Sequence, residues 1–185
     1  MIAELTTEQV ATVFARRSAP VAALDAEADE LAAACRAMAV RFRAGGRLLA
    51  MGTGTAAADA AHVVVEFVHP VIVGKRALPA LALPDGGSAA SVELFGRPAD
   101  IALAFSPDGR APQLAGALAA AARAGMLTIA LVGGDGGPVA ALPGLDHVIV
   151  VPSADPRVVR EAQVTIYHVL WELVHVFLDA GADAA

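Results

Sequence analysis

Hydrophobic residues in this chain form short uninterrupted runs, separated by longer segments in which apolar and polar positions follow a helical period. Five runs predict buried strands, at residues 48–51, 80–83, 101–105, 127–132 and 147–151, because strands of a parallel sheet are covered on both faces. The intervening segments predict helices at residues 6–17, 21–43, 55–69, 112–123, 138–142 and 157–178, with a helical turn within 91–97.

Individual residues mark where several of these helices begin or end. Thr6 and Gln9 have the spacing of a capping box, and Pro112 and Pro156 suit the first position of a helix. The tripeptide at 18–20, Ser-Ala-Pro, predicts a break between the first two helices.

Strands that alternate with helices predict an α/β fold: a three-layer α-β-α sandwich with a five-stranded parallel sheet, plus N-terminal helices. The 185 residues fit a single domain. Right-handed crossovers place the loops that follow the strands along one edge of the sheet. Loops 52–55, 85–88, 106–110 and 133–137 therefore share this edge, and a ligand is expected there.

The helix predicted at residues 21–43 carries a continuous apolar stripe. Two sets of apolar residues repeat along it every seven positions: Leu24, Leu31 and Met38, and Ala28, Cys35 and Phe42. A long helix in front of the first strand needs a surface that covers this stripe. Two arrangements remain open, packing between chains in a helical bundle and packing on the chain's own sheet.

Residues 47–69 hold the strongest functional signal of these patterns. The strand leads into the loop Gly52-Thr53-Gly54-Thr55, where glycine permits a sharp turn and lets a ligand approach the backbone. The first turn of the next helix offers N–H groups to an anion. Further along, His62 and Glu66 share one helical face. The stretch favours a phosphate-binding loop with a His/Glu pair beside it, and a plain surface pair is the alternative.

Composition narrows the functional classes. The sequence is 57% hydrophobic, but its longest run without a charged residue, 111–122, contains Pro112 and is too short to span a bilayer. The net charge of −6 disfavours nucleic-acid binding. Cys35 is the single cysteine, so no internal disulfide is possible. We therefore expect a cytoplasmic protein without a membrane or nucleic-acid partner.

Five motifs then follow one another along the chain. They are Gly52-Thr53-Gly54-Thr55-Ala56 with Asp59, His62 and Glu66; LPALALPD at 78–85; SPDGRA at 106–111; a Gly-Met start and Asp-Gly-Gly end at 125–137; and Arg160-Glu161 with His168. Their order resembles the sugar isomerase (SIS) domain family, and within it the phosphoheptose isomerase branch. The corresponding branch motifs are GNGGS with D-A-x-H-x-x-x-E, L-P-A-I-A-L-x-D, S-T-S-G-N-S, G-M-x-x-I-x-L-x-G-x-D-G-G and Q-E-x-x-x-x-x-x-H. The resemblance covers roughly the whole chain and implies a single, flavodoxin-like SIS domain at residues 1–185.

The resemblance implies a ketose–aldose interconversion of a seven-carbon sugar phosphate through an enediol. Glu66 and His168 take the positions of the base and the acid. Zinc is implied at His62, Glu66 and His168, whereas the fourth family position holds Arg160, which stays protonated and cannot ligate a metal. The implied substrate-binding residues are Gly52, Thr53, Gly54, Thr55, Asp85, Ser106, Asp108, Gly109, Arg110 and Arg160. A homotetramer packed through residues 1–44 and the last helix is implied as well.

Departures from the family pattern keep other interpretations open. In the third loop Pro107 removes an N–H donor and Asp108 adds a negative charge, while Arg110 could grip a phosphate if it turned inward. The segment 84–97 is also shorter than in the family. An altered substrate, or a non-catalytic sugar-phosphate-binding or scaffolding protein, fits these changes. A dinucleotide site is a further alternative, although Asp85 lies about 30 rather than about 20 residues after the glycine loop.

The remaining polar signals are weaker. His69, His147 and His175 have no motif support, so we predict structural or surface roles for them. The sequence Asp135-Gly136-Gly137 predicts a turn into a helix rather than a ligand site. His168 on its own would fit a core histidine, because apolar residues surround it in the sequence.

Overall fold

A five-stranded sheet forms the centre of the molecule in the computed structural model, which describes residues 5–182. The strands are β1 (Leu48–Gly52), β2 (Ala80–Ala82), β3 (Ile101–Ser106), β4 (Leu127–Gly133) and β5 (His147–Val151). They lie in the order β2-β1-β3-β4-β5, and every neighbouring pair is parallel. The predicted parallel sheet is confirmed, and its order is the flavodoxin-like one.

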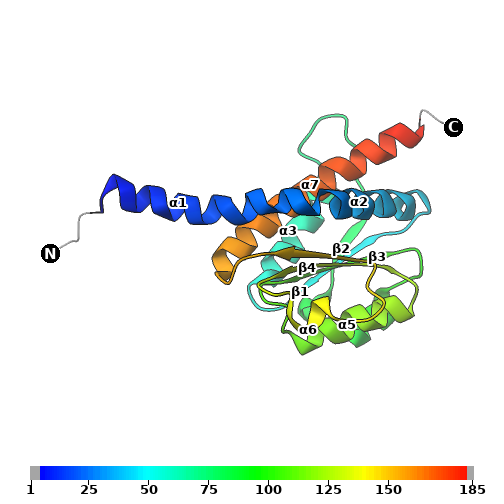
Figure 1. Cartoon of the computed structure of the whole chain (residues 1–185). Helices are drawn as coiled ribbons and strands as arrows, with labels where there is room; N and C mark the ends of the chain where they lie inside the picture. The colour runs from blue at the N-terminus through cyan, green and yellow to red at the C-terminus, as the bar shows by residue number, and fades with distance from the viewer. Residues whose placement is uncertain (1–4, 183–185) are drawn as a thin grey trace.

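Helices cover both faces of this sheet (Figure 1). One layer contains α2 (Ala28–Arg43), α3 (Ala56–Val68) and α7 (Pro156–Ala182); the other contains α4 (Ala89–Phe95), α5 (Pro112–Arg123) and α6 (Gly137–Ala140). Successive strand residues point to opposite faces. Leu103 and Phe105 accordingly pack against the first layer, and Ala102 and Ala104 against the second. The predicted three-layer sandwich is thereby confirmed.

The N-terminal helices differ from the prediction. The capping box of Thr6 and Gln9 is present at the start of α1 (Thr7–Ala22), but the break predicted at residues 18–20 is wrong. Pro20 removes one N–H donor in the last turn of α1, and the chain tightens into a 3₁₀ turn, Ala23–Glu27, after it. The helix predicted at residues 21–43 is therefore interrupted, and its second part alone forms α2.

The apolar stripe of α2 is covered within the chain. Leu31, Cys35, Met38 and Phe42 are buried in the core between α2, α3, α7 and the sheet. Helix α1, in contrast, has no buried residue and extends beyond the sheet (Figure 1). None of the helices in the described part of the chain combines the length and the apolar content needed to cross a membrane.

Candidate active site

Helices α3 and α7 pack against each other on one face of the sheet, and their facing side chains form a row. Residues 59, 62 and 66 lie on one face of α3 because their spacing follows the helical period. Three pairs face each other across the helices, in order along the row: Asp59 with Arg160, His62 with Tyr167, and Glu66 with His168. We call this row the α3–α7 seam.

The structure brings Glu66 and the two motif histidines together in the seam. His62 Nε2 lies 3.0 Å from Glu66 Oε1, and His168 Nε2 lies 3.7 Å from the same oxygen. The Glu66 side chain is 12% exposed, whereas His62 and His168 are 48% and 46% exposed. A carboxylate thus lies at the floor of the seam with an imidazole on either side, both open to solvent.

These three side chains also fit a metal ion. Their ligand atoms all lie within 4.8 Å of one another. Imidazole nitrogen and carboxylate oxygen are donors that zinc accepts, and three protein ligands with one open position are typical of catalytic zinc sites.

Arg160 points along the seam to Asp59 rather than to Glu66. Its guanidinium holds the carboxylate with two bonds, Nε to Oδ2 at 2.8 Å and Nη2 to Oδ1 at 3.1 Å. The Asp59 side chain is 5% exposed and that of Arg160 is 35% exposed. The hydrogen bonds to Asp59 raise the pKa of Arg160. The sequence motif contained Asp59, but it gave no reason to pair Asp59 with Arg160.

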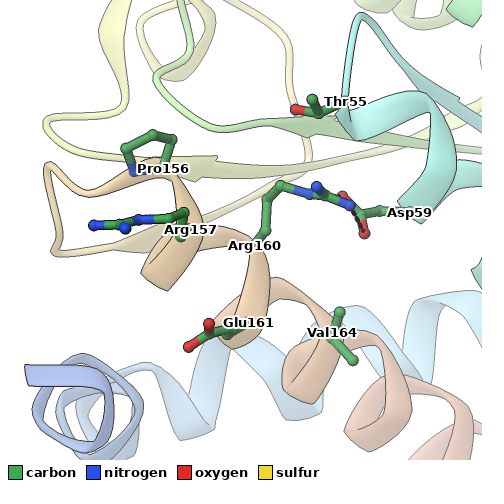
Figure 2. Close-up of a pocket in the computed structure, with 7 residues that line it drawn as sticks. All are labelled: Thr55, Asp59, Pro156, Arg157, Arg160, Glu161 and Val164. Atoms are coloured by element: carbon green, nitrogen blue, oxygen red, sulfur yellow. Dashed lines mark hydrogen bonds and ion pairs between the residues drawn. The ribbon is translucent and has the colours of Figure 1, made fainter. Parts of the chain in front are cut away.

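A cavity of about 380 Å³ adjoins this pair, between the first turns of α3 and α7. Its walls are formed by Thr55, Asp59, Pro156, Arg157, Arg160, Glu161 and Val164 (Figure 2). Figure 2 shows Arg160 reaching across to Asp59, whereas Arg157 points the other way. Arg157 pairs with Asp155 at 2.7 Å. The cavity therefore opens beside the seam at the ligand-binding edge that parallel strands create.

The glycine loop after β1 is a tight turn. The amides of the first three residues of α3 donate at 3.2 Å to the carbonyls of Thr53, Gly54 and Thr55. The prediction that these first-turn amides are free for an anion is therefore wrong, because 3₁₀ bonds use them. Gly54 has a φ of +59°, and a Cβ on Gly52 would lie 2.6 Å from the Ala56 carbonyl oxygen, so both positions need glycine. Thr55 lines the cavity and makes no capping bond.

The loop after β3 is bonded to itself. The Ser106 hydroxyl accepts from the Gly109 amide at 2.9 Å and donates to Asp108 at 3.3 Å. Asp108 also accepts from the Arg110 amide. The Arg110 guanidinium binds Asp135 on the exterior at 2.8 Å, so the inward turn considered for Arg110 does not occur. The polar groups expected to hold a phosphate here are largely engaged with one another.

Asp85 lies at the same edge, in the 3₁₀ turn Pro84–Gly86 after β2. Its backbone has a φ of +54°, and its carbonyl accepts a hydrogen bond from the Gln113 side chain. The next residue, Gly86, touches the glycine loop so closely that a Cβ would lie 2.4 Å from the Gly52 carbonyl oxygen. Asp85 is exposed beside that loop.

Two other histidines have structural partners, as predicted. Buried His175 contacts the Trp171 carbonyl at 2.8 Å and the Arg76 carbonyl at 3.1 Å, and His147 pairs with Glu30. His69 is exposed at the end of α3. The turn predicted at 135–137 leads into α6, with the Gly137 amide bound to Asp135.

Sequence reasoning missed Tyr167. This buried residue on α7 places its hydroxyl 2.6 Å from His62 Nδ1. Burial, and to a lesser extent the nearby carboxylates of Asp59 and Glu66, raise the pKa of Tyr167 to about 12. An aromatic residue on the apolar face of a helix gives no sign of such a contact, because core packing requires the same pattern.

Comparison with known proteins gives a consistent result. Residues 15–133 match the SIS domain family. A phosphoheptose isomerase of Chlorobaculum parvum is 37% identical over 168 residues, 80% of this chain and 78% of the relative, and one of Chlorobium phaeobacteroides is 39% identical over 172 residues, 82% and 74%. The solved phosphoheptose isomerases of Neisseria gonorrhoeae and Francisella tularensis match with TM-scores of 0.79 at 26% and 25% identity. These matches cover 90% and 92% of this chain, and 97% and 98% of theirs.

Proposed function

Because this chain belongs to the SIS domain family and, within it, to the phosphoheptose isomerases, we propose that it interconverts the ketose and aldose forms of a phosphorylated heptose of the sedoheptulose 7-phosphate type. The observation that carries the proposal is the position of Glu66, between two imidazoles in a seam whose Asp59 end borders a cavity.

Glu66 and His168 have the chemistry that the reaction needs. Glu66 acts as the base that takes the proton from the carbon next to the carbonyl, and His168 gives a proton to the carbonyl oxygen, which yields the enediol. The enediol then takes a proton on the other carbon and loses one from the other hydroxyl, which becomes the new carbonyl. Glu66 Oε1 lies 3.7 Å from His168 Nε2, so the two groups can reach neighbouring atoms of one substrate. His62 holds the carboxylate in place through its 3.0 Å contact.

Zinc is part of the proposal, with His62, Glu66 and His168 as its ligands. When bound, the ion would polarise the substrate carbonyl as a Lewis acid. Arg160 occupies the fourth family position and remains on Asp59. We therefore propose a site in which three residues of the chain, His62, Glu66 and His168, would hold the ion.

The cavity next to Asp59 and Arg160 accommodates the phosphorylated end of the substrate. Glu66 comes seven positions after Asp59, about 10 Å along α3 at about 1.5 Å per residue. This length suits an extended sugar phosphate whose carbonyl end reaches Glu66. Thr55, Arg157 and Arg160 are the side chains of the cavity lining that can donate hydrogen bonds, beside the carboxylates of Asp59 and Glu161. The loop 106–110 contributes less because its groups bond one another.

We further propose a homotetramer in the cytoplasm. Two observations support the assembly: α1 exposes Val10, Val13 and Phe14, and the seam imidazoles are nearly half exposed. A second copy that covered these surfaces would bury apolar area and exclude water from Glu66. Light scattering of the purified protein should give four times the chain mass, and a monomeric mass would contradict the assembly.

The decisive experiment is a screen of ketose and aldose phosphates for interconversion, with and without added zinc. Turnover of a heptose phosphate supports the proposal. The self-bonded loop 106–110 favours one other function, a non-catalytic sugar-phosphate-binding or scaffolding protein. A protein that shifts its melting temperature with sugar phosphates but converts none of them would support that function instead.

A further inference from the structure

Tyr167 holds a hydroxyl in the seam that the proposed reaction does not use. Its side chain is fully buried, and its ring packs edge-on against Phe105 of β3 at 5.8 Å between centroids. The same ring contacts His168 at 4.8 Å between centroids. The core therefore fixes the phenol, and its position does not depend on the half-exposed imidazole of His62.

Within residues 5–182, the one hydrogen bond of this hydroxyl joins it to His62 Nδ1, at 2.6 Å. A neutral imidazole carries its proton on one nitrogen only. If Nδ1 carried it, the phenol proton would lack a partner in a buried place, and bare Nε2 would face the Glu66 carboxylate at 3.0 Å. The favourable arrangement has the phenol donating to Nδ1 while Nε2–H donates to Glu66.

A metal at Nε2 requires the opposite tautomer, because that nitrogen must then be deprotonated. Nδ1–H needs an acceptor in this state, and metal-bound histidines almost always have one. The Tyr167 oxygen lies at hydrogen-bond distance for this role as well. A phenol both donates and accepts, so one side chain can satisfy His62 in either state.

We infer that Tyr167 is a positioning residue of this site, whose hydroxyl holds the ring of His62 so that Nε2 faces Glu66 and the proposed metal, and which favours the Nε2–H tautomer while the site is metal-free. Hydrogen bonds then connect the Tyr167 phenol in the core, through the His62 imidazole, to the Glu66 carboxylate.

The test compares the wild type with Y167F, which keeps the ring and removes the oxygen. Imidazole ¹⁵N shifts of the metal-free proteins, read on the neutral imidazole, report the tautomer of His62 without substrate or turnover. We expect the Nε2–H form in the wild type and its loss in Y167F. Zinc titration should show an affinity about 10–100-fold weaker in Y167F.

T165V is the matched control, because it deletes a hydroxyl from the exposed face of α7; within residues 5–182 the Thr165 hydroxyl bonds only to the Glu161 carbonyl. It should leave both readouts at the wild-type value. A wild-type His62 in the Nδ1–H form overturns the inference, whether or not Y167F folds. Equal zinc affinity in Y167F and the wild type, or no zinc binding by the wild type, overturns the metal part. Neither readout uses turnover. The inference about Tyr167 can therefore fail while the proposed isomerase activity stands, and the isomerase activity can fail while the inference stands.

Discussion

Glu66→Gln removes the proposed base while it keeps the size of the side chain and an oxygen that can accept a hydrogen bond. Glutamine has nearly the same shape, and its amide oxygen can still accept the hydrogen bond that His62 Nε2 makes at 3.0 Å. The seam should therefore keep its packing while losing the group that takes a proton. General base catalysis contributes about 10²–10⁴-fold to rate, which corresponds to about 2.7–5.4 kcal/mol in the activation barrier. We expect kcat to fall by that factor and KM to change little.

The assay is the interconversion of the best sugar phosphate from the screen, measured at saturating substrate. Glu172→Gln is the control: the same change on the exposed surface of α7, one turn beyond His168, which should leave kcat unaltered. Circular dichroism and the melting temperature establish that both variants fold. A kcat for E66Q within about tenfold of the wild type would refute the assignment of Glu66 as the base, since no positioned base could be lost at so small a cost.

Two further predictions concern the stability of the fold. R160M should lower the free energy of unfolding by about 2–4 kcal/mol, because buried Asp59 loses its cation. The measurement is urea unfolding, with R157M as the control: it breaks an exposed pair and should barely move the midpoint. Equal losses of stability in R160M and R157M would contradict this reasoning. Burial raises the pKa of Cys35 to about 12, so the folded state keeps a proton that the unfolded state loses from about pH 9. Stability should therefore fall as the pH rises from about 9 toward 12, and C35A should flatten that slope; an unchanged slope would show that the thiol does not contribute.

The sheet could be predicted from the sequence because its strands are covered on both faces. Continuous apolar runs then follow directly from burial, and the predicted strand at 147–151 and helix at 112–123 match β5 and α5 residue for residue. The failure at Pro20 has a physical reason: proline removes one donor, and near a helix end the neighbouring turn can absorb that loss. A rule based on residue type alone does not take into account how close the proline lies to the end of the helix.

The candidate site was predictable only where the helical period sets the geometry. Residues four positions apart lie on the same face of any α-helix, so His62 and Glu66 had to be neighbours, and the motif placed His168 near them. Arg110 was harder, because its partner Asp135 is 25 residues away and competes with any ligand for the guanidinium. Contacts between distant elements, such as Tyr167 with His62, become visible only once α3 and α7 are packed together.

The polar contacts of this molecule differ in burial, and burial indicates which of them stabilise the fold. Asp59 with Arg160, and His175 with the Arg76 carbonyl, are largely buried and join segments that are distant in the sequence, so fold stability accounts for them. His62 and His168 are nearly half exposed, and exposed ionic contacts contribute little to stability. A scaffolding role therefore leaves the two imidazoles beside Glu66 without an explanation. Isomerase chemistry, in contrast, needs a shielded carboxylate and an accessible acid within reach of one substrate.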